Sequence, residues 1–319
     1  MAEFRTYTAI GQREDLSNTI YNIAPTETPV VSSIGKTKAT ATYHEWQTDD
    51  LAAASAAGLV EGADASGASD TPTTRVGNRT QIQGKTVHIS GTLDAVDKAG
   101  RKTETAYQLA KAGQELKRDM EKTILGNVAQ DAGAAGSARL LGSIQSWLGT
   151  NFVTMTDGVA PVGSNGTAAR TEGATASAFT EAKLKEVVKS CFENGGNPTL
   201  LVVPPTQKQV VSSFPGIAEQ RYAAPSDKQT TIMGAADVYL SDFGTLSVVP
   251  DRFMTADTSP AAEQALVLDP SMASVATLRP FQSNLLAKSG DSEKHQMLVE
   301  YTLQVSNEKA HGIVADLAV

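Results

Sequence analysis

One long amphipathic helix is the feature that most constrains how this chain can fold. Apolar and small side chains recur at spacings of three and four over residues 102–126, at Ala106, Leu109, Ala110, Gly113, Leu116, Met120, Ile124 and Leu125. Glu104 falls in the first turn and Lys122 near the end, which suits the helix dipole, and Gly126 follows as a stop. At 1.5 Å per residue this helix would be about 40 Å long, so we expect a spine on which other elements pack.

Residues 1–42 are expected to form an extended arm. The apolar spacing over residues 13–23 allows a short helix, but the prolines at positions 25 and 29 prevent a helix from continuing. Such a segment buries too little surface to be ordered alone, so we expect it to lie along another surface.

Residues 43–92 predict a long β-hairpin. One strand is expected over residues 40–48 and the other over residues 79–90, and the tip between them, residues 51–74, is Ala, Gly, Ser and Asp with almost no large apolar side chain. Gly84 within the second strand suggests a bulge or a break. A hairpin of this kind is marginally stable alone, so it needs a neighbour to lie on.

The rest of the chain predicts both helices and strands, and therefore an α+β fold with a small α/β layer. Helices are expected at 180–194 and 206–213, and strands at 199–203, 236–241, 244–249, 264–268, 274–278 and 296–307. The final strand alternates, with Met297 and Val305 on one face and Glu300 on the other, which predicts a half-buried strand.

The charge balance argues against a reader of DNA sequence. The formal net charge is −8 at pH 7, and the mild cluster of Lys111, Lys117, Arg118 and Lys122 is interleaved with acidic residues. This pattern is typical of a solvated helix face and gives no basic patch for duplex DNA.

The sequence also indicates the cellular compartment in which the protein is made and kept. The N-terminus has no apolar segment of a secretory signal, and the longest strongly apolar run, Leu200 to Val203, is too short to span a bilayer. The one cysteine, Cys191, excludes a disulfide within the chain and a thiolate metal cluster. We therefore expect no membrane association and a cytosol-like compartment.

No residue pattern predicts catalysis, a cofactor or a metal. Two Gly-Lys-Thr tripeptides, beginning at Gly35 and Gly84, lack the earlier glycine of a phosphate-binding loop, because Val30 and Arg79 stand there. No two of the four histidines are three or four residues apart. Cys191 lies on the apolar face of its expected helix, which favours a buried structural thiol.

The order of the elements (arm, hairpin, spine helix, α/β insert and closing strand) resembles the Hong Kong 97-type fold of tailed-phage major capsid proteins. Several short stretches carry a second resemblance: Asn-Thr-Ile-Tyr-Asn-Ile-Ala-Pro-Thr-Glu-Thr-Pro-Val at 18–30, residues 95–100, 104–109 and 115–121, and Val-Glu-Tyr-Thr-Leu at 299–303. These stretches are similar to the SU-ten-like group of major head proteins.

This resemblance implies a structural protein that self-assembles into the icosahedral head shell around double-stranded DNA. It divides the chain into an N-arm at 1–42, an E-loop hairpin at 43–92, a P-domain with the spine helix at 93–139, an A-domain at 140–275, and a return to the P-domain with a long C-terminal strand at 276–319. The expected contacts between subunits are at Pro25, Pro29, Trp46, Leu59, Arg118 and Tyr222.

The implied partners are copies of the same chain in hexamers and pentamers, because appendages that are unstable alone imply partners. A scaffold, a portal and decoration proteins are also expected. The chain starts almost at the arm, which suggests either a separate scaffold protein or already processed material. The implied location is the virion capsid, after assembly in the host cytoplasm.

Two alternatives stay open at this point. One is a soluble hydrolase or transferase with a scattered site, whose sign is a deep pocket lined by convergent titratable groups. The other is a different virion component, such as a tail-tube subunit, which would lack the long central helix.

Overall fold

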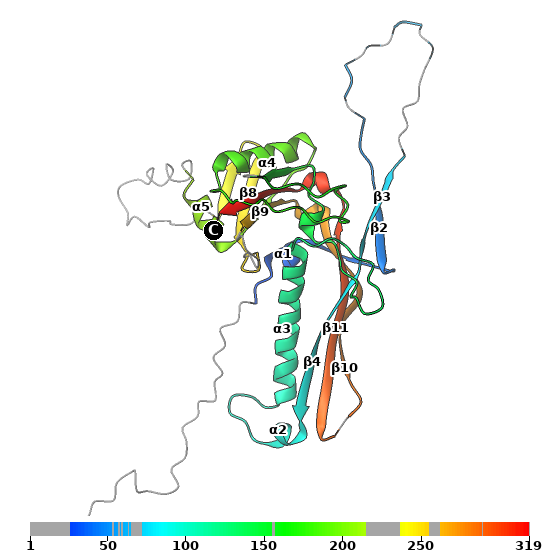
Figure 1. The fold of residues 1–319 in the computed structure, drawn as a ribbon, viewed down its shortest axis with the longest axis vertical. Coiled ribbons are helices and arrows are strands. Elements are labelled where there is room, and N and C mark those ends of the chain that lie inside the picture. Colours follow the sequence, from blue (N-terminus) through cyan, green and yellow to red (C-terminus); the bar gives the residue numbers. More distant parts are fainter. Residues whose placement is uncertain are drawn as a thin grey trace, which may run out of the picture.

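The chain folds into a slender lobe, a compact lobe and a hairpin that projects beyond both (Figure 1). The computed structural model describes residues 26–52, 54–56, 58, 60–62, 64, 72–154, 157–214, 237–254, 262–288 and 290–318. The helix expected at 13–23 and the expected contact residues Pro25, Leu59 and Tyr222 lie outside these ranges.

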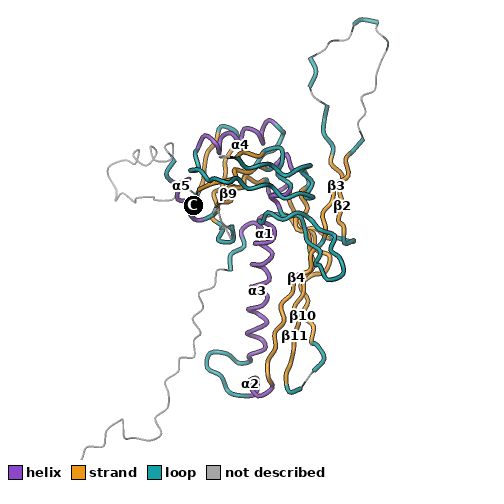
Figure 2. Tube along the Cα trace, in the orientation of Figure 1, coloured by secondary structure: helices purple, strands orange, loops and turns teal. Residues whose placement is uncertain are grey.

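The described elements are distinguished as helix, strand and loop in Figure 2. The helices are α1 (Pro29–Ser33), α2 (Gly91–Ala95), α3 (Glu104–Leu125), α4 (Glu181–Glu193) and α5 (Pro205–Ser212). The strands are β1 (Gly35–Lys38), β2 (Tyr43–Thr48), β3 (Thr74–Arg79), β4 (Gln81–Ser90), β5 (Phe152–Thr154), β6 (Leu200–Val203), β7 (Val238–Ser241), β8 (Gly244–Pro250), β9 (Ala262–Leu268), β10 (Ala273–Leu285), β11 (Ser292–Val305) and β12 (Gly312–Ala318).

The slender lobe is α3 packed along a four-stranded sheet with the order β1-β10-β11-β4 (Figure 1). The 22 residues of α3 confirm the predicted spine, and at 1.5 Å per residue they span about 33 Å. The helix packs against β4 and β11. Its buried apolar side chains form one stripe, which consists of Ala112, Leu116, Met120, Ile124 and Leu125.

The compact lobe is a six-stranded mixed sheet with the order β5-β12-β9-β6-β8-β7, and α4 lies over one of its faces (Figure 1). Successive side chains of β6 point into different cores. Leu201 packs in a cluster with Leu184 of α4, whereas Val202 packs in a cluster with Leu125 at the end of the spine. This sheet therefore joins the two lobes.

Burial along β11 rises toward its C-terminal end. Ser292 to Leu298 are half-buried, whereas Val299 to Leu303 are buried on both faces of the strand. The expectation of a half-buried strand is therefore right for its first half and wrong for its second. The reason is that α3 and β3 both pack against β11.

The predicted hairpin is right in its first strand and wrong in its pairing. β2 pairs with β3, from Tyr43↔Arg79 to Thr48↔Thr74, whereas β4 turns away and pairs with β11. Gly84 is not at a bulge, because its register with Leu298 is continuous. A Cβ at this glycine would lie 2.5 Å from Leu298 Cδ2, so glycine makes room for that side chain.

The expected arm ends earlier than residue 42. Pro29 begins α1, where a missing N–H costs little, and Val30 and Ile34 are buried. β1 then pairs in parallel with β10, beginning at Gly35↔Ser274. Residues 29–38 are therefore part of the slender lobe.

The closing segment, residues 276–319, is divided between the two lobes. It was expected to return as one piece to the region of the spine helix, and β11 does so. β12, which the sequence did not predict, instead pairs with β5 and β9 in the compact lobe. The helices at 180–194 and 206–213 and the strands β6 to β9 are confirmed within a few residues.

Candidate functional site

The described surface carries no enclosed pocket of convergent titratable groups. A depression of about 320 Å³ between α3 and β4 is lined by residues that include Lys85, Lys111 and Glu115. These charges are paired, with Lys85 Nζ 2.8 Å from Asp119 Oδ2 and Lys111 Nζ 3.9 Å from Glu115 Oε1. Paired charges on an open face are typical of a solvated surface and not of an active site.

The structure also shows where the candidate phosphate-binding and metal-binding residues of the sequence lie. Both Gly-Lys-Thr tripeptides lie in strands, β1 and β4, and not in loops. Among the described residues, no three His, Cys, Asp or Glu side chains cluster as a metal ion would require. The described helices include none with the length and apolarity needed to cross a bilayer.

Cys191 is expected to resist thiol reagents in the folded protein. It is fully buried on α4, and burial raises the pKa of its thiol to about 12, so the reactive thiolate is scarce near neutral pH. Ellman's reagent at pH 8 should therefore titrate one thiol per chain after denaturation and almost none before it. Rapid reaction of the native protein would contradict this burial.

The root of the hairpin, meaning the part of β2 and β3 that contacts the rest of the chain, is fixed to the body, although the hairpin itself projects (Figure 1). Trp46 of β2 stacks on the buried Trp147, with ring centroids 5.3 Å apart. Asn78 of β3 is fully buried, and its Nδ2 donates to Gly142 O at 2.9 Å and to Leu303 O at 2.8 Å. Its Oδ1 accepts from Gly142 N at 2.8 Å. Apolar and polar contacts thus set the direction in which the hairpin leaves the body.

A Trp46→Ala variant is expected to lower the free energy of unfolding by about 2 kcal/mol, less than truncation of a fully buried aromatic residue because Trp46 is half-buried. Trp46→Phe keeps a ring against Trp147 and should cost less than half as much. Urea unfolding followed by circular dichroism measures both values. Equal losses from the two variants would mean that ring stacking does not hold the root.

Glu300 of β11 fixes the point where the chain passes from the hairpin into β4. Its side chain is 5% exposed and accepts from Arg279 Nε at 2.7 Å and from Thr80 Oγ1 at 2.8 Å. It also forms an ion pair with Arg139, whose Nε donates to Thr80 O at 2.5 Å. A buried carboxylate requires such donors, and here they come from three segments.

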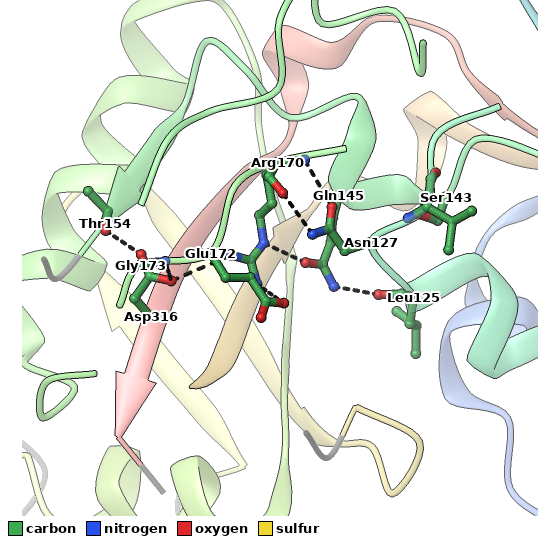
Figure 3. A network of polar contacts seen from close by, with 10 residues as sticks. Leu125, Asn127, Ser143, Gln145, Thr154, Arg170, Glu172, Gly173 and Asp316 are labelled. Carbon is green, nitrogen blue, oxygen red and sulfur yellow. Dashed lines mark hydrogen bonds and ion pairs between the residues drawn. The ribbon is translucent and has the colours of Figure 1, made fainter. Parts of the chain in front are cut away.

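A second buried ion pair ties the segment between β5 and α4 to β12 (Figure 3). The side chains of Arg170 and Asp316 are 1% and 0% exposed, with Arg170 Nη1 3.5 Å from Asp316 Oδ1. Asp316 also accepts from Gly173 N at 2.9 Å and from Thr154 Oγ1 at 2.5 Å. Burial lowers the pKa of Arg170, but Glu172 and Asp316 oppose that effect, and a guanidinium stays charged.

The same network reaches the end of the spine helix (Figure 3). Arg170 Nε donates to Gln145 Oε1 at 2.7 Å, and Gln145 Nε2 donates to Leu125 O at 2.6 Å. That carbonyl is one of those that a helix end leaves without a partner in the helix. Asn127 and Arg170 exchange two further hydrogen bonds of 3.0 Å. The network therefore couples the spine helix to the compact lobe.

Three of the six expected contact residues are described, and each lies against its own chain. Pro29 starts α1, Trp46 packs on Trp147, and the Arg118 guanidinium lies 5.5 Å from the centre of the Phe253 ring. As contacts between subunits, all six residues remain predictions.

The anchoring residues themselves were not predicted from the sequence. Glu300 and Asp316 each carry a usable signal, because a charged residue inside an apolar strand must find a buried partner. Asn78 and Arg170 lie in polar stretches that give no such signal.

The decisive comparison is with protein families. The model of the SU10 major capsid protein family matches residues 4–318. The chain belongs to the SU10 major capsid protein family. Members of such a family are structural subunits, so this capsid protein is not an enzyme.

Individual relatives agree with this family. The major capsid protein of Escherichia phage Phieco32 is 38% identical over 128 residues, so the match spans 40% of this chain and 36% of that protein. A chain of Mycobacterium phage Ogopogo is 14% identical, with a TM-score of 0.61 over 99% of this chain and 100% of that one.

Two further solved structures share the fold. The capsid of a native GTA particle is 13% identical, with a TM-score of 0.62 over 99% of this chain and 100% of that one. The SrpI encapsulin of Synechococcus elongatus is 12% identical, with a TM-score of 0.53 over 99% and 96%. At these identities the likeness concerns the fold, and it confirms the α+β Hong Kong 97-type capsid fold.

Proposed function

We propose that this capsid protein is the subunit of the icosahedral head shell that encloses the double-stranded DNA of a tailed bacteriophage. The observation that carries the proposal is the family match over residues 4–318. The long α3 favours it over a tail-tube subunit. The GTA capsid, an assembled particle by its name, supports self-association through this fold.

The proposal assigns each part of the molecule to a region of such a shell. In this proposal the N-arm is residues 1–28, which precede α1, and the E-loop is the hairpin of β2 and β3. The P-domain is the slender lobe with α3, and the A-domain is the compact lobe with α4. The arm and the hairpin lie over neighbouring subunits, while the compact lobes meet at the centres of hexamers and pentamers.

Assembly is then a binding reaction made of many weak contacts. Each overlap of an arm or a hairpin with a neighbour contributes little alone, and the overlaps add through multivalency. The anchored root fixes the direction of the hairpin. The small side chains of residues 51–74 allow the same sequence to adapt to several local environments. Pro25, Leu59 and Tyr222 remain the contact residues proposed for the arm, the hairpin tip and the segment between α5 and β7.

The remaining partners follow from the same proposal. A scaffold, a portal and decoration proteins bind the shell, which is assembled in the bacterial host cytoplasm. The DNA is enclosed without sequence-specific binding, in keeping with the net charge of −8.

Sedimentation velocity of the purified full chain tests self-association. The chain has a mass of 33.4 kDa, and the proposal expects particles of many subunits besides capsomers or single chains. A Trp46→Ala variant, in which the root of the hairpin is loosened, should shift material from particles to small species. A wild-type chain that stays monomeric with and without its co-expressed scaffold would count against the proposal.

A further inference from the structure

We propose that Glu121 and Asp251 share one proton and form a latch that holds α1, the point where the N-terminal segment joins the body, against the spine helix. Loss of the proton weakens the latch. The inference concerns the single chain, so it stands or falls independently of shell assembly.

The latch begins with Glu121 on α3, which receives the start of α1. Glu121 is fully buried, and its Oε1 accepts from Val30 N at 2.7 Å while its Oε2 accepts from Val31 N at 2.8 Å. These are amides of the first turn of α1, which lack partners within their own helix. One side chain of the spine therefore holds the beginning of α1.

The second group of the latch is Asp251, in the turn after β8. Asp251 is 1% exposed, and its carboxyl lies close enough to Glu121 to raise the pKa of that residue. Its Oδ1 accepts from Phe253 N at 2.6 Å, whereas its buried Oδ2 has no donor among the described residues unless Glu121 is protonated. A proton on Glu121 supplies that donor, so the pair is satisfied as one acid and one carboxylate.

The described residues around the pair provide no counter-charge for two carboxylates. In the described part of the chain, no ion pair joins a Lys or Arg to Glu121 or Asp251. α1 carries no titratable side chain. On the neighbouring segments, Lys122 and Arg252 are exposed and Arg118 lies over the ring of Phe253. Two adjacent buried carboxyls without a cation cannot both ionise at low cost.

The titration of the pair agrees with this geometry. Burial, and next the contact with Asp251, raise the pKa of Glu121 to about 8, although its bonds to Val30 and Val31 act in the opposite direction. Burial raises the pKa of Asp251 as well, while its contact with Glu121 lowers it. The two carboxyls titrate as a pair, and the proton that they share is the last to leave as the pH rises.

The sign of the pH effect follows from linkage. A carboxyl whose pKa is higher in the latched state stabilises that state at low pH, because the latched state binds the proton more tightly. The ordinary pKa is 4.5 and the latched value about 8, so the stabilisation is complete below pH 4.5, declines above it and is lost beyond about pH 8. Within this window the equilibrium constant for opening should rise by up to about tenfold per pH unit.

Hydrogen–deuterium exchange of the full chain, read on peptides that contain the amides of Val30 and Val31, tests the latch. Between pH 5.5 and 8.5, after correction for intrinsic exchange, protection of these amides should fall by about tenfold or more. Peptides from α4 should show no such trend, which separates latch opening from global unfolding.

Variants of the two carboxyls test whether their shared proton causes the pH dependence. Asp251→Asn supplies a permanent donor and removes the neighbouring carboxylate, so it should weaken the pH dependence of the protection of α1, although burial still raises the pKa of Glu121. Glu121→Gln should remove the pH dependence, at lower protection, and it decides the question if the first variant does not fold. Asp119→Asn is the matched control, because it neutralises an exposed carboxyl on the same helix that pairs with Lys85, and it should keep the wild-type profile.

Two results would overturn the proposal. One is a wild-type profile that is flat across the pH range. The other is a pH dependence that persists undiminished in Asp251→Asn or persists in Glu121→Gln, or one that α4 shares.

Discussion

Replacing Asp316 with Asn is expected to lower the free energy of unfolding by about 3 kcal/mol, because Arg170 then keeps its charge in a buried site without its buried counter-ion. The side chain of Arg170 is 1% exposed, so water cannot replace the lost carboxylate. Asp316 has a φ of 60°, in the left-handed region, which Asn tolerates almost as well as Asp. The change therefore reports on charge and not on backbone strain.

Urea unfolding of the unassembled subunit measures this loss. Glu172→Gln is the matched control, because Glu172 lies 3.4 Å from the same guanidinium but is 37% exposed. The control should cost less than about 1 kcal/mol, as exposed ion pairs do. If the two variants lose the same amount, the buried pair does not hold β12 to the segment between β5 and α4.

Deletion of residues 52–70 is expected to abolish closed shells while the subunit still folds. The root of the hairpin does not depend on the deleted residues, because β2 and β3 pair up to Thr48↔Thr74 and Trp46 and Asn78 anchor them. The remaining residues between the two strands are enough for a short hairpin loop. What is lost is the reach of the hairpin to a neighbour.

Electron microscopy and thermal unfolding together measure this outcome. Replacing residues 52–70 with a Gly/Ser linker of equal length is the control that keeps the length and changes the side chains. If the linker variant forms shells and the deletion does not, assembly depends on the length of the hairpin and not on the side chains of its tip. Normal shells from the deletion would refute an assembly role for the hairpin tip.

Local patterns predicted the elements, and distant contacts decided their pairing. α3 and α4 follow from a periodicity contained within each helix, so the sequence predicts them within two residues. β4 carries the expected strand pattern, but its partner β11 lies more than two hundred residues away, and no local signal distinguishes it from β2. The fold predicted from the order of the elements was nevertheless confirmed, because a wrong strand pairing does not change that order.

The candidate site was harder to predict for the same reason. Glu121 was assigned to a solvated helix face because Lys117 and Lys122 surround it in sequence, yet it is fully buried beneath α1. Asp316 shows the difficulty again, because its strand is a short apolar run whose charge is balanced by Arg170, far away along the chain. Sequence spacing can indicate that a charge needs a partner, but only the fold supplies it.

Negative-stain electron microscopy of the purified wild-type chain, expressed alone and with its scaffold, tests the central claim most directly. The account predicts closed, roughly isometric shells built from this chain. Open tubes would point instead to a tail-type assembly. A chain that remains as single subunits under both conditions would contradict its role as a shell subunit.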